Sequence, residues 1–495
     1  MILLRNEREM KFVREKPRPM NKQKINRIAA FCLLAAFGMI FLAEASLAQE
    51  PRRAVRRFSD REASAEANRR LVIEGSGGQS DLLQVAISDL QVTGGADNDL
   101  QVQYDKTMRY DLEFSDYFEP IQNNSAMIAQ HRQDMAVRAI DYTAWQNLNC
   151  AVLVKGEFQN QGNQGNIRLY AYDVYDEKSL NALEYTIQFD SNEKKIREVR
   201  RAVHNFVDGL VQKYDPEGFP GCAHTYIAFE NSNWRADTGG GKKKIREIFI
   251  MDYDGRNIRQ ITQDRDLCLS PSWAPDGRKL VYTSFRQSNP DLYIYNLDTG
   301  KIRVLAAFPG MNGAASWSPD GNNLAITLSR DGNPEIYRIS ADGSQATRLT
   351  RSRHVETSPT WSPDGKWIYF ISDRFGAPQI MRMPAGGGQA TTIAKGGQND
   401  DPSVSPRGKL IAYTSSLGGG GFNIWVADVN GGGARNLTQD LSGNCEMPSW
   451  APDGRHIVFS HRGQLVIMDA DGRDKRYITS GERVRGECTS PAWGP

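Results

Sequence analysis

The 495-residue sequence has almost no net charge and lacks the motifs of several common enzyme classes. Its formal charge of +2 argues against a general role in binding nucleic acid or a membrane surface. The strings G-x-S-x-G and H-E-x-x-H and the Walker glycine loop are absent, which disfavours a serine hydrolase, a zinc peptidase and a phosphate-loop enzyme. None of the six histidines has paired zinc-ligand spacing. We therefore expect no cofactor and no catalytic metal, although carboxylates near the repeats described below could hold a cation.

A short segment, SPSWAPDG at 270–277, returns along the second half of the chain at a nearly constant interval. Its relatives are ASWSPDG at 315–321, SPTWSPDG at 358–365, DPSVSPRG at 401–408, MPSWAPDG at 447–454 and a truncated SPAWGP at 490–495. The anchor residues are Trp273, Trp317, Trp361, Val404, Trp450 and Trp493, spaced 44, 44, 43, 46 and 43 residues apart. This period is typical of a four-stranded propeller blade, so six anchors predict six blades.

Each repeat has the pattern of consecutive β-strands. The Pro-Asp-Gly after the anchor favours a hairpin turn, because proline presets one backbone angle and glycine tolerates a left-handed exit. Short apolar runs rich in β-formers follow, as at 280–282 and 368–371, and glycine-containing turns separate the later strands.

The two ends of the array complement each other. Residues 225–262 contain second, third and fourth strands without a preceding anchor segment, and the last residues of the chain, 490–493, supply that missing segment. We therefore predict a propeller closed by one blade built from both ends, which leaves no open sheet edge at the seam.

The beginning of the chain has the layout of a secretory signal. Basic residues after Met20 precede an apolar run from Ile28 to Ala43, and Ser46-Leu47-Ala48 forms a small-residue site. We predict that residues 1–48 are removed by cleavage between Ala48 and Gln49, giving a periplasmic, monomeric protein without stable membrane insertion. The alternative is a single membrane anchor, since sixteen apolar residues approach the lower spanning limit.

Residues 49–70 form an arginine-rich segment, with seven arginines against four acidic residues. It has little apolar surface to bury, so a solvated, mobile arm is one interpretation. The other interpretation is an arm that binds a partner.

Residues 71–218 combine helical and strand patterns, which predicts a separate α/β domain with a mixed sheet. Strands are expected at 71–73, 150–154 and 168–174, and helices at 125–148, with a break midway, and at 196–211. The breakers at 215–221 predict a link to the propeller, which we place at 222–495.

Five cysteines would remain after leader removal. Cys268, Cys445 and Cys488 each lie five residues before an anchor, at one equivalent repeat position on consecutive blades of the closed ring. An oxidising periplasm would permit a bridge from Cys488 to Cys445 or Cys268 if two of them come close, but spacing does not give the connectivity.

The six repeats with their terminal SPAW, the Tyr253-Asp254-Gly255 turn, the Asn312-Gly313-Ala314 segment and the preceding α/β domain together resemble the TolB family, periplasmic components of the bacterial Tol-Pal envelope system. The resemblance implies a non-enzymatic protein that binds the peptidoglycan-associated lipoprotein Pal through the propeller and the inner-membrane protein TolA through its mature N-terminus. It implies a role in outer-membrane integrity and in constriction during division. Other outer-membrane lipoproteins are further potential partners.

The sequence departs from the family pattern in two places. The arginine-rich arm is longer than expected, and the fifth repeat has Val404 and Arg407 where the motif has Trp and Asp. We interpret the second departure as packing variation.

Pal is expected to dock at the channel mouth, on the segments just before the anchors, because these segments lead from one blade to the next and converge on the axis. The predicted residues are Met311, Asn312, Ala314, Glu356, Thr357, Ser358, Asn399, Asp400 and Glu446. By resemblance, Met311, Ala314, Thr357 and Ser358 match positions that the family uses against Pal. One alternative is that these residues only form turns and were selected for packing. The other alternative is that the protein is a hydrolase or lyase that acts in the channel, for which Glu356 or Asp400 would be mutated first.

Overall fold

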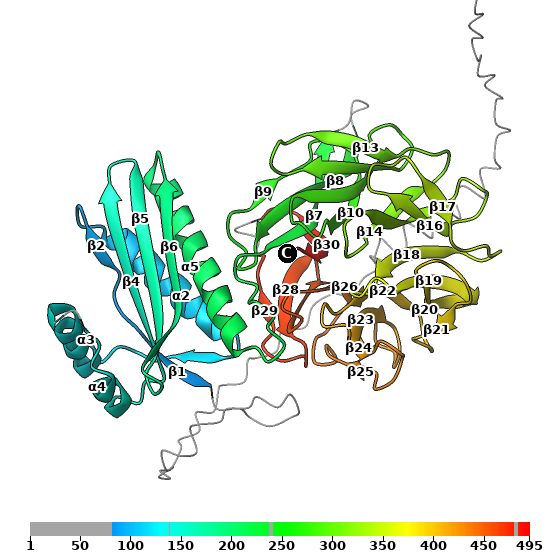
Figure 1. Ribbon diagram of the computed structural model, residues 1–495. Coiled ribbons are helices and arrows are strands. Elements are labelled where there is room, and N and C mark those ends of the chain that lie inside the picture. The colour runs from blue at the N-terminus through cyan, green and yellow to red at the C-terminus, as the bar shows by residue number, and fades with distance from the viewer. Residues whose placement is uncertain (1–81, 138, 237–240, 480–483) are drawn as a thin grey trace, which may run out of the picture. The chain divides into compact units, whose positions relative to one another are not determined.

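The computed structural model describes residues 82–137, 139–236, 241–479 and 484–495, all within one compact unit. An α/β domain is followed by a six-bladed β-propeller (Figure 1), as the sequence predicts. The predicted leader, its cleavage site, the arginine-rich arm and the strand at 71–73 lie outside the described residues. Among the described helices, none is both long and apolar enough to cross a bilayer.

The α/β domain is a six-stranded sheet with helices packed against it. Its elements are β1 (Leu83–Ile87), β2 (Gln91–Thr93), α2 (Asn98–Phe114), β3 (Phe118–Pro120), α3 (Ser125–Val137), α4 (Tyr142–Asn147), β4 (Val152–Gln161), β5 (Gln164–Asp173), β6 (Lys178–Gln188) and α5 (Asn192–Tyr214). The strand order is β3-β1-β4-β5-β6, and β2 also pairs with β4. The β1 and β2 pairings with β4 are parallel, whereas β4, β5 and β6 form antiparallel hairpins, so the sheet is mixed as predicted.

Helix α5 covers one face of this sheet because its apolar residues recur every three or four positions. The recurring buried residues are Val199, Val203, Phe206 and Leu210. They share a core with α2 and with the inward side chains of the strands. Ser191 begins α5 and Asp97 begins α2, and each side chain accepts a backbone N–H of the first turn.

The predicted break in the helix at 125–148 separates α3 from α4. Asp134 near the end of α3 accepts the indole N–H of Trp145 at 2.8 Å and the backbone N–H of Asp141 at 3.2 Å. This buried carboxylate links the two short helices, which pack against the start of β4.

The propeller consists of six four-stranded antiparallel sheets. Blade 1 contains β30 (Glu487–Trp493), β7 (Tyr226–Ala236), β8 (Lys242–Asp252) and β9 (Arg259–Gln260), and blade 2 contains β10 (Cys268–Trp273), β11 (Lys279–Ser284), β12 (Asp291–Asn296) and β13 (Ile302–Ala306). Blade 3 contains β14 (Asn312–Trp317), β15 (Asn323–Leu328), β16 (Glu335–Ser340) and β17 (Ala346–Arg348), and blade 4 contains β18 (Glu356–Trp361), β19 (Trp367–Phe375), β20 (Ala377–Pro384) and β21 (Thr391–Thr392). Blade 5 contains β22 (Asn399–Val404), β23 (Leu410–Ser415), β24 (Asn423–Asp428) and β25 (Arg435–Asn436), and blade 6 contains β26 (Cys445–Trp450), β27 (His456–His461), β28 (Gln464–Asp469) and β29 (Arg476–Tyr477).

The first strand named for each blade is its inner strand, and the inner strands of neighbouring blades touch one another around the ring. The predicted closure is confirmed, since β30 from the C-terminus pairs with β7, with Trp493 opposite Ile227 and Cys488 opposite Asn231. We call the face where inner strands begin the upper face. The face with the Pro-Asp-Gly turns is the lower face.

The α/β domain contacts the lower face of blades 1 and 6. Phe114 of α2 packs edge-on against Tyr253 at 4.9 Å between ring centroids and stacks on His456 at 4.2 Å. Because Phe114 is buried in the same cluster as Ala451 and Trp493, the two folds share an apolar contact.

The structure corrects the disulfide prediction. Cys268, Cys445 and Cys488 are buried free thiols, each near the start of the inner strand of its own blade. They lie on separate inner strands, and each has its own polar neighbours. The Cys268 thiol donates to Asp264 Oδ2 at 3.3 Å, and Cys488 Sγ accepts from Asn231 Nδ2 at 3.5 Å. Cys150 and Cys222 are also buried and free.

Candidate binding site at the channel mouth

All six inner strands carry a left-handed residue three positions before the anchor. These residues, none of them glycine, are Ser270, Ala314, Ser358, Asp401, Met447 and Ser490, with φ between 47° and 60°. Since L-residues rarely adopt this conformation, its sixfold recurrence marks a built feature of the blade.

The left-handed residue lies in a β-bulge. In blade 3 the pairing of β14 with β15 shifts between Gly313 and Ser316, and equivalent shifts occur in the other five blades. One extra residue in the inner strand reverses the alternation of side chains beyond it. As a result, the residue five positions before each anchor points into the blade, and the next two lie at the channel mouth.

The second strand of one blade braces the bulge of the next. Three described contacts are Thr327 Oγ1 to Thr357 Oγ1 at 3.3 Å, Met447 N–H to Thr414 Oγ1 at 3.0 Å, and Ser460 Oγ to the Cys488 carbonyl at 3.4 Å. These bonds tie neighbouring blades together at the mouth, so its shape is fixed by the ring.

The bulge divides the predicted site residues into two groups. Asn312, Glu356 and Asn399 are fully buried. Asn312 donates to the carbonyl of Phe308 at 2.7 Å and accepts its N–H at 2.9 Å, while Glu356 accepts from Arg374 at 2.7 Å. Asn399 donates to the carbonyl of Gly396, in the loop before it, at 2.9 Å. These three side chains therefore shape the loops of the upper face and do not offer a contact surface.

The remaining predicted residues line the mouth. Four of them are half-buried, namely Met311, Ala314, Ser358 and Glu446. The other two are mostly buried, since Thr357 is 9% exposed and Asp400 is 8% exposed. Sequence reasoning missed Asp401, which occupies the same repeat position as Ala314 and Ser358; aligning the repeats residue by residue would have found it.

Asp400, Asp401 and Glu446 bring three carboxyl groups together at blades 5 and 6. Burial raises the pKa of Asp401 to about 8, and the charges of Asp400 and Glu446 add to the shift. Burial also raises the pKa of Asp400 and of Glu446. Among the described residues no basic side chain forms an ion pair with any of the three, so this side of the mouth is acidic and its carboxyl groups keep their protons to a higher pH than usual.

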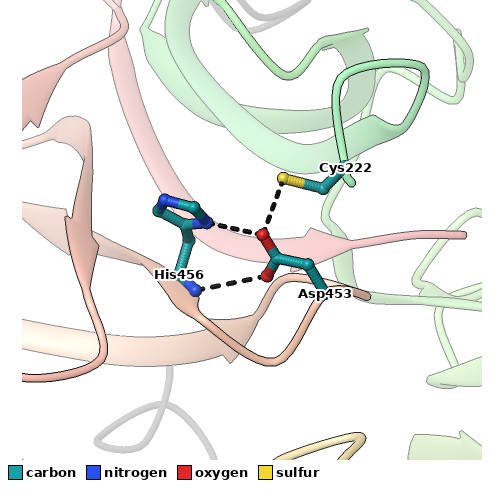
Figure 2. A group of neighbouring side chains, drawn as sticks. All are labelled: Cys222, Asp453 and His456. Carbon is teal, nitrogen blue, oxygen red and sulfur yellow. Dashed lines mark hydrogen bonds and ion pairs between the residues drawn. The ribbon is translucent and has the colours of Figure 1, made fainter. Parts of the chain in front are cut away.

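A second group of potential ligands lies on the lower face, where Cys222, Asp453 and His456 meet (Figure 2). His456 Nδ1 lies 2.6 Å from Asp453 Oδ2, the Cys222 thiol donates to the same oxygen at 3.3 Å, and the other carboxylate oxygen accepts the backbone N–H of Arg455 at 2.8 Å.

The chemistry of this group fits hydrogen bonding better than metal binding. Burial raises the pKa of the Cys222 thiol well above its usual value, so the thiolate that a metal needs is disfavoured. Burial opposes the charge on His456, but Asp453 beside it raises the pKa of the ring overall. The result is a thiol and an imidazole ring that both contact one carboxylate, which favours the charged form of the ring.

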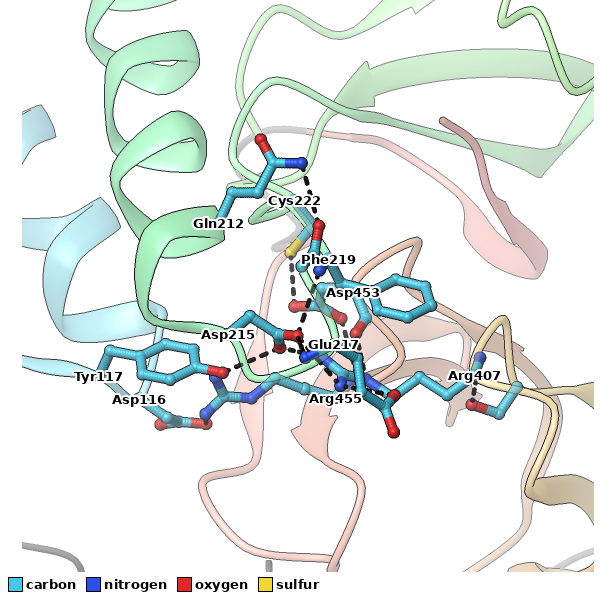
Figure 3. A network of polar contacts seen from close by, with 12 residues as sticks. Asp116, Tyr117, Gln212, Asp215, Glu217, Phe219, Cys222, Arg407, Asp453 and Arg455 are labelled. Carbon is cyan, nitrogen blue, oxygen red and sulfur yellow. Dashed lines mark hydrogen bonds and ion pairs between the residues drawn. The ribbon is translucent and has the colours of Figure 1, made fainter. Parts of the chain in front are cut away.

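Arg407 connects the fifth blade to the α/β domain (Figure 3). Its guanidinium bonds the Asp215 carboxylate, donates to Glu217 Oε2 at 3.2 Å and stacks over the Phe219 ring at 4.6 Å. Tyr117 OH donates to Asp215 from the other side at 2.9 Å. The departure of the fifth repeat at Arg407 is therefore a specific interdomain contact, which corrects our interpretation of it as packing variation.

Comparison with known protein families identifies both folds. Residues 218–495 match the model described as the TolB beta propeller domain, and residues 71–180 match the TolB amino-terminal domain. The propeller match alone covers more than half of the chain.

Curated relatives and solved structures agree with these models. The chain is 32% identical over 243 residues to the Tol-Pal system protein TolB of Paramagnetospirillum magneticum, covering 47% of this chain and 49% of that protein. It is 35% identical over 186 residues to the protein of the same name from Desulfosudis oleivorans, covering 38% of each. The matches thus span half or less of these relatives.

The crystal structure of TolB from Acinetobacter baumannii is similar over 84% of this chain and 97% of that chain, with 29% identity and a TM-score of 0.67. The two family models together cover residues 71–180 of the α/β domain, the repeats and the closing strand. The chain belongs to the TolB family.

Proposed function

We propose that this protein is a non-enzymatic periplasmic scaffold of the Tol-Pal system. It binds Pal at the channel mouth on the upper face and TolA through its mature N-terminus, and in this way supports outer-membrane integrity and constriction during division. The observation that carries the proposal is the braced ring of bulges, which presents Ala314, Ser358 and their equivalents from six blades at one mouth.

The mouth has the properties of a preorganised protein-binding site. Its backbone is fixed by bonds between blades, so little conformational entropy is lost when a partner binds. The described contacts of the α/β domain with blades 1 and 6 lie on the lower face, on the opposite side of the ring from the mouth.

The proposal is tested by placing a large side chain in the mouth. Ala314→Arg should weaken binding of purified Pal in calorimetry by at least tenfold, which corresponds to about 1.4 kcal/mol, because a hot spot at the centre of an interface contributes about 2 kcal/mol or more. Thr347→Arg is the matched control, since Thr347 is exposed on the outermost strand of the same blade. Equal affinities for the two variants, with unchanged melting temperatures, would remove the mouth from the proposal.

The N-terminal contact has its own test. Deleting residues 49–70 should abolish TolA binding while Pal binding and the melting temperature of the propeller stay unchanged, because no repeat lies in that segment. Retained TolA binding would place that site elsewhere.

The acidic group at blades 5 and 6 is the observation that favours the enzyme alternative, because a protonated Asp401 could serve as a general acid. Hydrolytic activity on a panel of envelope glycans and peptides, lost in Asp400→Asn or Asp401→Asn, would support that alternative over the scaffold.

A further inference from the structure

Two hairpins of the propeller extend farther on the upper face than the others. In blades 2, 3, 5 and 6 the second strand ends opposite the residue that begins the inner strand, at Ser284, Leu328, Ser415 and His461. In blade 4, β19 continues from Ser372, opposite Glu356, to Phe375. In blade 1, β7 continues from Asn231, opposite Cys488, to Ala236.

Each extension carries an exposed aromatic residue. Trp234 on β7 is 65% exposed and Phe375 at the end of β19 is 66% exposed, which makes them the most exposed large apolar residues of the described propeller. Neither has a ring partner among the described residues. Large exposed aromatics with no packing role are typical of interaction surfaces.

The two hairpins stand on opposite sides of the channel mouth. Blades 2 and 3 separate blade 1 from blade 4 in one direction around the ring, and blades 5 and 6 separate them in the other. Both aromatics lie on second strands, about 4.8 Å outward from the inner strands and beyond their ends. A ligand confined to the channel would therefore touch neither, whereas a folded domain seated on the upper face can touch both.

Basic side chains lie near both hairpins, although Lys243 already pairs with Asp266 and Lys244 with Glu487. Trp234 lies opposite Lys244 in the hairpin, followed by the exposed Lys243 and Lys242. Beside the other tip, Val355 pairs with Asp373, which brings the exposed Arg353 next to the hairpin. Lys242 and Arg353 have no acidic partner within the described parts of the chain.

We propose that Trp234 and Phe375 are two anchors that clamp the protein partner docked at the channel mouth. The partner they fit is a folded domain with two apolar patches, each bordered by carboxylates that face Lys242 and Arg353. This inference rests on the proposed function and adds to it a second zone of contact outside the channel. Two anchors on opposed blades also fix the rotation of the partner about the channel axis, which a round mouth alone does not.

The experiment uses the full mature chain and purified Pal as the probe. Trp234→Ala and Phe375→Ala should each weaken Pal binding in calorimetry by about tenfold, and the double variant by about a hundredfold, because distant sites act additively. Val304→Ala is the matched control, since Val304 is also exposed but lies on the outermost strand of blade 2. Melting temperatures should not change, because neither aromatic is packed.

The result for Ala314→Arg separates the two proposals. Weakened binding in both the tip variants and Ala314→Arg supports the clamp. Wild-type affinity in the tip variants, with loss in Ala314→Arg, overturns the clamp and keeps the mouth. Loss in the tip variants alone keeps the anchors and overturns the mouth. Absence of Pal binding by the wild-type chain overturns the proposed function and the clamp with it.

Discussion

Arg407 of the fifth blade and Asp215 at the end of α5 form an ion pair that joins the propeller to the α/β domain. The Asp215 carboxylate is buried and also accepts the Tyr117 hydroxyl and two backbone N–H groups of the link that follows it. Burial opposes the charge on Asp215, but these donors and Arg407 hold the pKa of the carboxyl below its usual range. A residue that breaks the repeat motif thus stabilises the domain arrangement.

Arg407→Ala should destabilise the contact between the two domains by about 2–4 kcal/mol, because it leaves a buried carboxylate without its cation. Calorimetric unfolding should then show the α/β domain melting ahead of the propeller. Lys409→Ala is the control, since Lys409 is 71% exposed and pairs with the same link through Glu217, and it should cost less than about 1 kcal/mol. A single unshifted transition in Arg407→Ala would contradict this account.

The His456 cluster makes stability depend on pH. Asp453 raises the pKa of His456. The ion pair therefore gives its full stabilisation below about pH 6.5, the ordinary pKa of histidine, and this stabilisation is lost as pH rises through the higher pKa of the folded state. Burial and Asp116 raise the pKa of Asp469, which lies 4.0 Å from the ring, to about 7, and this acts in the same direction.

Urea unfolding of the wild type should therefore show a loss of about 1 kcal/mol or more between pH 6 and pH 8, and His456→Gln should flatten that dependence. An identical slope in wild type and His456→Gln would assign the pH dependence to other groups.

Asp401→Asn should stabilise the protein near pH 8. The folded state keeps Asp401 protonated up to a pKa of about 8, whereas the unfolded chain releases this proton at lower pH. Rising pH therefore destabilises the folded protein, and a neutral amide of the same shape at position 401 avoids this loss. We expect no gain at pH 4 and a gain that grows by up to about 1.4 kcal/mol per pH unit as pH rises from 4 to 8, measured by chemical unfolding. An unchanged pH dependence in Asp401→Asn would assign the loss of stability to other groups.

The left-handed bulge predicts a specific pattern of tolerance at Ser358. Ser358→Val should cost about 2 kcal/mol, because a β-branched residue does not adopt positive φ, whereas Ser358→Gly should be neutral or slightly stabilising. Thr360→Val, two residues later in extended backbone, should be tolerated. Equal losses for valine and glycine at position 358 would mean that the hydroxyl matters more than the backbone.

The propeller was predictable because its signals are local and repeated. The anchors at Trp273, Trp317 and their equivalents fix the period, and the unmatched ends of the array predict the pairing of β30 with β7. In the α/β domain α2 was not predicted, although Leu100, Tyr104, Met108 and Leu112 recur every four residues and are all buried.

The orientation of side chains at the mouth was not predictable from the repeat motif. Asn312 and Glu356 lie five residues before Trp317 and Trp361, so strict alternation would place each on the strand face opposite its anchor, but the bulge reverses the alternation and both side chains are buried in the blade. Cys268, Cys445 and Cys488 occupy the same repeat position, but their thiols remain free. Each of these side chains is buried in its own blade, so an equal repeat position does not bring the sulfur atoms together.

The binding of Pal at the mouth is tested most directly by amide hydrogen exchange of the full mature chain with and without saturating Pal. The account predicts added protection at the starts of the inner strands, at 311–316, 356–360, 399–403 and 445–449, and none at the Pro-Asp-Gly turns of the lower face. Protection confined to the lower face or to the outermost strands, with the inner-strand starts unchanged, would contradict it.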